Sequence, residues 1–154
     1  MVFESTTAAP VPASPGNALR AVVRRRWPTL LGLAMVLGFA VAAPDASWIG
    51  VLVLILAALA YPAFGLYRRH LHGSRVLLVQ AAALFGFLGL ATVLLFVEGT
   101  AGRLLLAAGF LAHAAWDFAH HRADLMVPRW YAEFCAVVDV LVAAALVLGV
   151  VTAG

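Results

Sequence analysis

The chain contains five long apolar runs, and the later runs are separated by short polar connections. The runs cover about 28–46, 47–67, 76–97, 101–121 and 130–152. Each is close to the ~20 residues that a helix needs to cross a hydrocarbon core of about 30 Å. The runs are continuous and lack the two-residue alternation of barrel strands, so they predict helices. We therefore expect an all-α, polytopic membrane protein, built as a bundle of five transmembrane helices.

The residues before the first run have a different composition. Residues 1–19, MVFESTTAAPVPASPGNAL, are rich in Pro, Ala, Ser and Thr and carry one charge. This composition predicts a disordered cytoplasmic tail, which leaves residues 20–154 as a single membrane domain.

The first run also admits a second interpretation. RRRWPTLLGLAMVLGFAVAA has the basic start, apolar stretch and Ala-x-Ala end of a cleaved signal peptide. A retained helix is favoured, because the arginines follow a long tail and the next apolar run begins almost at once.

Composition agrees with a membrane location. The chain is 65% hydrophobic and 11% charged, and its mean hydropathy is +1.03. A soluble domain of 154 residues could not bury that much apolar surface. The formal net charge of +3 comes with ten arginines and no lysine. These arginines flank the apolar runs, which indicates membrane topology, so we expect the lipid bilayer as partner and no nucleic acid.

The arginines also predict the orientation. Nine of the ten precede the first run or lie in the second and fourth connections: Arg20, Arg24, Arg25, Arg26, Arg68, Arg69, Arg75, Arg122 and Arg129. Only Arg103 falls on the other side. By the positive-inside rule, the N-terminus is cytoplasmic and, after five crossings, the C-terminus is outside. The expected location is the bacterial inner membrane, as a multi-pass protein.

Ionisable residues inside the runs are the strongest functional signal, because a charged side chain in hydrocarbon costs roughly 2.5–3.5 kcal/mol on insertion scales. They concentrate in the last two runs and form the candidate metal-ligand set: His113, Asp117, His120, His121, Glu133 and Asp139. On a helix, His113, Asp117 and His120 share one face. A second face carries small residues, which predicts close helix packing there: Ala108, Ala112, Ala115 and Ala119.

Depth adds a second constraint. If the last two helices form an antiparallel pair, His113 and Asp139 lie at one level, and Asp117 lies near them. We therefore expect a cytoplasm-facing polar cavity between these helices. Its candidate lining residues are Tyr61, Gln80, Trp116 and Cys135.

Three functions suit such a cavity. Histidine and carboxylate ligands suit Zn, Fe or Mn, and a metal here would act on a membrane-soluble substrate. One ion cannot bind both His113 and His120, which lie ~10 Å apart along the helix axis. Asp117 is thus the shared ligand, joined by His113 or by His120 and His121, with Glu133 or Asp139 completing the shell. The alternatives are a structural His–Asp pair in a non-enzymatic subunit and a proton or ion pathway.

The last third of the chain contains HAAWDFAHH, then VPRWYAEFCAVVD. This segment resembles a small group of bacterial membrane proteins known mainly as a domain of unknown function. The shared pattern is His-x-x-Trp-Asp-x-x-His-His, a Pro, and a Cys before an Asp: His113, Trp116, Asp117, His120, His121, Pro128, Cys135 and Asp139. The resemblance implies a polyhelical membrane protein in which the last two helices form one module. It implies no reaction, and a homo-oligomer or a membrane-protein partner stays open.

Overall fold

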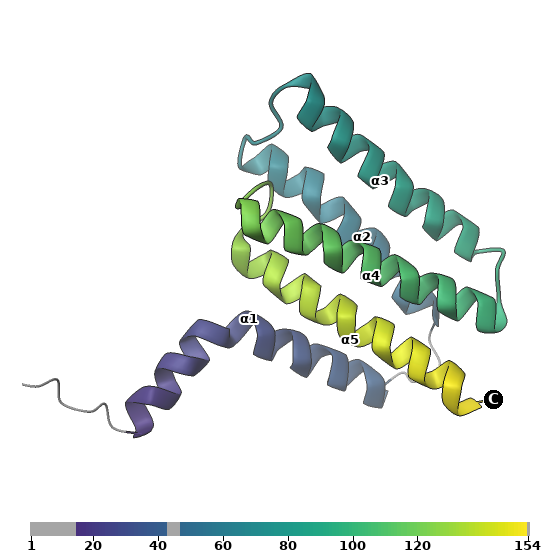
Figure 1. Ribbon diagram of the computed structural model, residues 1–154, viewed down its shortest axis with the longest axis horizontal. Coiled ribbons are helices and arrows are strands. Elements are labelled where there is room, and N and C mark those ends of the chain that lie inside the picture. The colour runs from purple at the N-terminus through teal and green to yellow at the C-terminus, as the bar shows by residue number, and fades with distance from the viewer. Residues whose placement is uncertain (1–14, 43–46, 154) are drawn as a thin grey trace, which may run out of the picture.

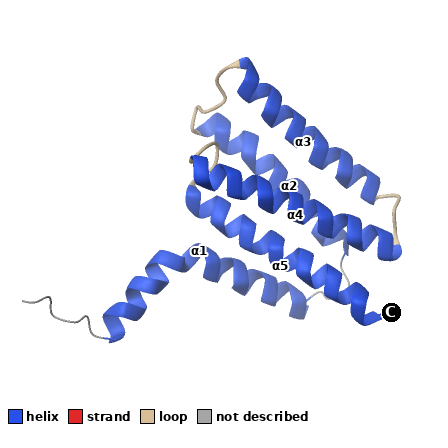
Figure 2. Ribbon diagram, in the orientation of Figure 1, coloured by secondary structure: helices blue, strands red, loops and turns tan. Residues whose placement is uncertain are grey.

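All the regular secondary structure in the described residues is helical. A computed structural model describes residues 15–42 and 47–153. It contains α1 (Pro15–Ala42), α2 (Ser47–Tyr67), α3 (Ser74–Leu94), α4 (Gly99–Ala123) and α5 (Arg129–Ala153). The described residues include no strand, so the all-α prediction is confirmed (Figure 2). Of these helices, α2, α3 and α5 are long and apolar enough to cross a membrane.

The first helix differs most from the sequence prediction. Residues 15–19 were predicted to belong to a disordered tail, and the helix was predicted to start at Pro28, but α1 begins at Pro15 and contains Pro28. The residues between are mostly Ala, Leu, Val and Arg, which permit a helix. A proline inside a helix removes one backbone hydrogen bond and bends the helix. Pro28 therefore marks a bend in α1 and not its start. Figure 1 shows α1 bending partway along its length.

Parts of two other predictions lie outside the described residues. These are residues 1–14 of the predicted tail, and residues 43–46, which end both the first predicted run and the proposed signal sequence.

The other four helices match their predicted runs closely. The range of α2 agrees with the prediction, and the ends of α3, α4 and α5 differ from the predicted ends by at most three residues. α4 is followed by Asp124, which adopts a left-handed conformation with φ 50°, a conformation that Asp accepts more readily than most residues. The short connection that follows lets α5 return along α4.

The packing order places α4 at the centre. α4 and α5 run antiparallel and share the most extensive interface, and α4 also contacts α2 and α3 (Figure 1). α1 packs on the far side of α5. The predicted antiparallel pairing of the last two helices is therefore confirmed.

Two apolar clusters stabilise the bundle, and the polar residues of α4 and α5 lie between them along these helices. One cluster comprises Leu54, Leu106, Ala107, Phe110 and Ala143. The other comprises Tyr61, Met126, Val127 and Ala132. Large apolar side chains elsewhere are exposed, among them Leu56, Leu78, Phe85 and Leu148. Exposed apolar side chains on these helices suit contact with lipid.

The predicted packing face of α4 is wrong. All four alanines of that face, at 108, 112, 115 and 119, are exposed. Close approach occurs on the polar side instead, at Gly109. A Cβ built there would lie 2.6 Å from Leu90 Cδ2 and 3.1 Å from Leu54 Cδ2. The reason is that the buried ionisable residues must face the other helices, and this turns the alanines outward.

The glycine contact gives a test of this packing. Gly109→Val should destabilise the protein by about 1–3 kcal/mol, because the added methyl groups would force Leu54 and Leu90 apart. The matched control is Gly89→Val on α3, where a Cβ meets nothing within 4 Å. Thermal unfolding of both purified variants in mild detergent is the measurement, and equal losses of stability would contradict the packing described here.

Candidate functional site

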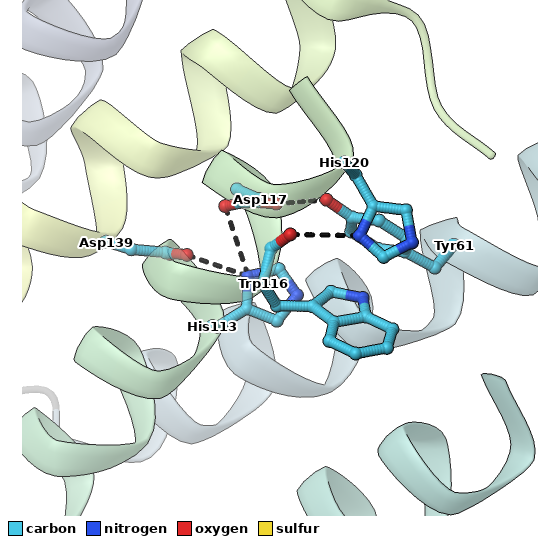
Figure 3. A network of polar contacts seen from close by, with 6 residues as sticks. All are labelled: Tyr61, His113, Trp116, Asp117, His120 and Asp139. Carbon is cyan, nitrogen blue, oxygen red and sulfur yellow. Dashed lines mark hydrogen bonds and ion pairs between the residues drawn. The ribbon is translucent and has the colours of Figure 1, made fainter. Parts of the chain in front are cut away.

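The centre of the site is His113, which lies between two carboxyl groups. His113 and Asp117 are one turn apart on α4, and Asp139 comes from the middle of α5. His113 Nδ1 is 2.7 Å from Asp139 Oδ2 and 3.4 Å from Asp117 Oδ2 (Figure 3). The exposed fractions of the three residues are 0%, 0% and 1%. His113 and Asp139 lie at one level, as predicted from the sequence, and a hydrogen bond joins them.

Tyr61 connects this centre to α2. Its hydroxyl donates a hydrogen bond of 2.5 Å to Asp117 Oδ1, and its ring meets the His113 ring edge-on with centroids 5.7 Å apart. Phe87 of α3 also contacts the His113 ring, with the two ring centroids 5.0 Å apart. Phe87 was not among the predicted residues, because a phenylalanine in an apolar run carries no sequence signal of a site.

The centre has more negative than positive charge when both carboxyl groups are ionised. Among the described residues, arginine ion pairs involve Glu133 and Asp124, not these two carboxylates. Two buried polar atoms of the site, His113 Nε2 and Asp117 Oδ2, have no hydrogen-bond partner within the described parts of the chain. A buried polar atom without a partner costs about 1–3 kcal/mol, so both atoms favour a further partner: a ligand at Asp117 Oδ2 and a hydrogen-bond partner at His113 Nε2.

His120 has a different role from His113. Its Nδ1–H donates to the Trp116 carbonyl oxygen at 2.9 Å, and its Nε2 accepts from Gln80 Nε2 at 3.0 Å. Both ring nitrogens of a neutral imidazole are thereby occupied. His120 thus connects α4 to α3 by a hydrogen bond and has no free nitrogen for a metal.

The remaining predicted ligands lie apart from the centre. Glu133 accepts a hydrogen bond of 2.5 Å from the Thr29 hydroxyl of α1, and Arg26 Nη1 lies 3.8 Å from it. His121 is partly exposed and is not part of the His113 cluster. Helical periodicity accounts for Glu133, because it lies six positions before Asp139, and this offset turns its side chain away from Asp139 and toward α1.

A small cavity adjoins the centre. Its volume is about 10 Å³. It lies between α2, α3 and α4, and not between α4 and α5 as the sequence predicted. Tyr61, Gln80, His113 and Trp116 are among its lining residues. Cys135 is buried on α5 and does not line it. A cavity of this volume holds about one water molecule.

The centre offers one imidazole and two carboxylates as ligands. His113, Asp117 and Asp139 each supply one ligand atom, and these atoms all lie within 4.8 Å of one another. Zinc, iron and manganese accept such a mixed set of nitrogen and oxygen ligands. The same atoms can instead hold protons in a hydrogen-bonded network.

Comparison of the chain with protein-family models, curated proteins and solved structures finds no match. Function is therefore inferred from the site alone.

The contribution of the Tyr61–Asp117 hydrogen bond to stability can be tested by removing the Tyr61 hydroxyl oxygen. Tyr61→Phe should lower the free energy of unfolding by about 1.5–3 kcal/mol, because a buried carboxylate loses its hydroxyl donor. Tyr67→Phe, on the same helix, is the matched control, since Tyr67 is 85% exposed. Unfolding followed by tryptophan fluorescence in detergent compares the two. If both variants are as stable as the original protein, the Tyr61–Asp117 bond contributes nothing.

Proposed function

We propose that the chain is a five-span protein of the bacterial inner membrane that binds a divalent metal ion at His113, Asp117 and Asp139. The observation that carries this proposal is the cluster itself: three ligand-type side chains from two helices, fully buried and with their ligand atoms within 4.8 Å. Zinc, iron and manganese are the ions that suit the ligands.

Charge balance supports a metal. Two carboxylates, a neutral imidazole and a divalent cation together have no net charge, which suits a site buried between helices. Without the ion, the same neutrality requires two additional protons. Metal-bound Nδ1 would leave the ring proton on His113 Nε2, and the small cavity that this residue lines has room for one water molecule to accept it.

The distances allow a metal after a small adjustment. Metal–ligand bonds of about 2.0–2.2 Å place tetrahedral ligand atoms roughly 3.4 Å apart. The His113–Asp117 distance is already 3.4 Å, whereas His113 and Asp139 are 2.7 Å apart. Asp139 would retreat by roughly 0.7 Å, which a side-chain rotation provides. A membrane-soluble substrate would reach the ion only if α2, α3 and α4 separated, so the function we propose is metal binding.

The second candidate function is structural. The short His113–Asp139 distance favours it, because 2.7 Å is an ordinary hydrogen bond between imidazole and carboxylate. In that case the network holds α4, α5 and α2 together without an ion. The two functions differ at Asp117, where Asn retains a hydrogen bond but weakens a metal site.

The proposal also includes five membrane-spanning helices and a cytoplasmic N-terminus. Arginines of different helices gather at one end of the bundle, where Arg68 bonds the Met126 carbonyl oxygen and Arg26 lies near Glu133. α4 is less apolar than its neighbours because of His113, Asp117 and His120, and all three are buried among the other helices. Buried ionisable residues are compatible with a membrane-spanning helix in a bundle.

Metal content distinguishes the two candidate functions. Protein purified without a histidine tag should contain about one metal ion per chain by mass spectrometry, after incubation with Zn, Fe(II) or Mn if necessary. Asp139→Asn and Asp117→Asn should lose it, because an amide is a much weaker ligand than a carboxylate. Glu133→Gln and His121→Ala are the matched controls and should retain it.

Circular dichroism and gel filtration establish that each variant is folded. Metal-free protein after all three incubations would overturn the metal proposal, as would equal metal loss in Glu133→Gln and Asp139→Asn.

The orientation is tested with reporter fusions in bacteria. Alkaline phosphatase fused after residue 154 should be active, because that enzyme folds outside the cytoplasm, while a fusion in the 124–128 connection should be inactive. The reverse pattern, or activity at both positions, would contradict an N-in, five-span topology.

A further inference from the structure

The N-terminal part of α1 projects from the bundle. Beyond its bend, this part of α1 leaves the direction shared by the other helices (Figure 1). Every side chain from Gly16 to Trp27 is exposed. At 1.5 Å per residue, these residues form a rod of roughly 18 Å. A helix of this length with exposed apolar side chains needs a surface to cover them.

The projecting segment is amphipathic. Leu19, Val23 and Trp27 recur every four residues and fall within roughly 80° of each other around the helix. All three are more than 40% exposed. Arg20, Arg24 and Arg25 lie outside this apolar arc, at one edge of it and on the opposite side. Arg26 lies at the other edge, beside Leu19, and its Nη1 is 3.8 Å from Glu133 Oε1.

Aromatic and polar contacts fix the level at which the segment leaves the bundle. The Trp27 and Trp130 rings lie 5.2 Å apart, centroid to centroid. Tryptophans of this kind gather at the boundary between hydrocarbon and lipid headgroups. One residue after Pro28, the Thr29 hydroxyl donates a hydrogen bond to Glu133 of α5. The projecting segment therefore joins the bundle at the level where the apolar part of the bundle ends.

We propose that residues 15–27 lie in the membrane interface and that their arginines bind the phosphate groups of anionic phospholipids. Leu19, Val23 and Trp27 would enter the boundary of the acyl chains, while Arg20, Arg24 and Arg25 reach the headgroups. Guanidinium groups bind phosphate through paired hydrogen bonds. Each arginine near an anionic surface raises the affinity about fivefold. This inference is independent of the metal proposal.

The experiment uses the full chain in lipid nanodiscs. In a Cys135→Ala background, an environment-sensitive fluorophore is attached through Leu19→Cys or Ala21→Cys, which lie on opposite sides of the helix and leave every arginine in place. In discs of phosphatidylcholine with phosphatidylglycerol, brominated acyl chains should quench the label at 19 severalfold more than the label at 21. Aqueous iodide should show the opposite order.

Charge dependence completes the test. Replacing phosphatidylglycerol by phosphatidylcholine, or replacing Arg20, Arg24 and Arg25 by Gln, should reduce the docked fraction, with a loss of affinity on the order of a hundredfold for three arginines. Equal exposure of both labels to iodide in anionic discs would overturn the proposal. Protection that depends on protein concentration but not on lipid composition would also overturn it, because a second copy of the chain would then cover the segment.

Discussion

The imidazole of His113 between the carboxyl groups of Asp117 and Asp139 is the interaction on which the arrangement of the bundle depends. Two acidic residues inside an apolar helix pair are costly unless other polar groups meet them. Here the partner of Asp139 is His113 on α4, and the partner of Asp117 is Tyr61 on α2. Three helices are thereby held at one level and in one rotation about their axes. Gln80 extends the same constraint to α3 through His120.

This constraint explains which faces of α4 are buried. The ionisable face must point inward, so the residues beside it, Gly109 and Ala114, become the packing surface. The alanines on the opposite face then point outward. Sequence reasoning treated small residues at helical spacing as a packing face, but burial of charge is the stronger requirement when both are present on one helix.

Much of the fold and part of the site can be predicted from the sequence, because apolar length and the rise per residue of a helix are regular. Apolar length predicts α2 to α5 within a few residues, and the rise per residue places His113 beside Asp139. Tyr61 and Gln80 can be selected as polar residues at a matching depth. Side-chain direction is harder to predict. Glu133 shares a helix with Asp139 but faces α1, and its partner Thr29 is an ordinary residue in an apolar run.

The start of α1 was missed for a different reason. The first apolar run begins at Pro28, directly after three arginines and a tryptophan, and this predicted a helix start there, whereas the helix begins at Pro15 and continues through Pro28 with a bend. The resulting molecule has two parts with different chemistry. A buried cluster of one imidazole and two carboxyl groups lies in the bundle, and the arginine-rich N-terminal part of α1 lies outside it. α5 contacts both parts, through Asp139 and Trp130.

The most direct test of the proposed metal centre is X-ray diffraction from crystals of the protein incubated with zinc, with data collected at the zinc absorption edge. The account predicts an anomalous peak about 2.0–2.2 Å from one atom each of His113, Asp117 and Asp139. Density without a peak at this position, with His113 Nδ1 still hydrogen-bonded to Asp139, would contradict a metal centre and leave a purely structural network.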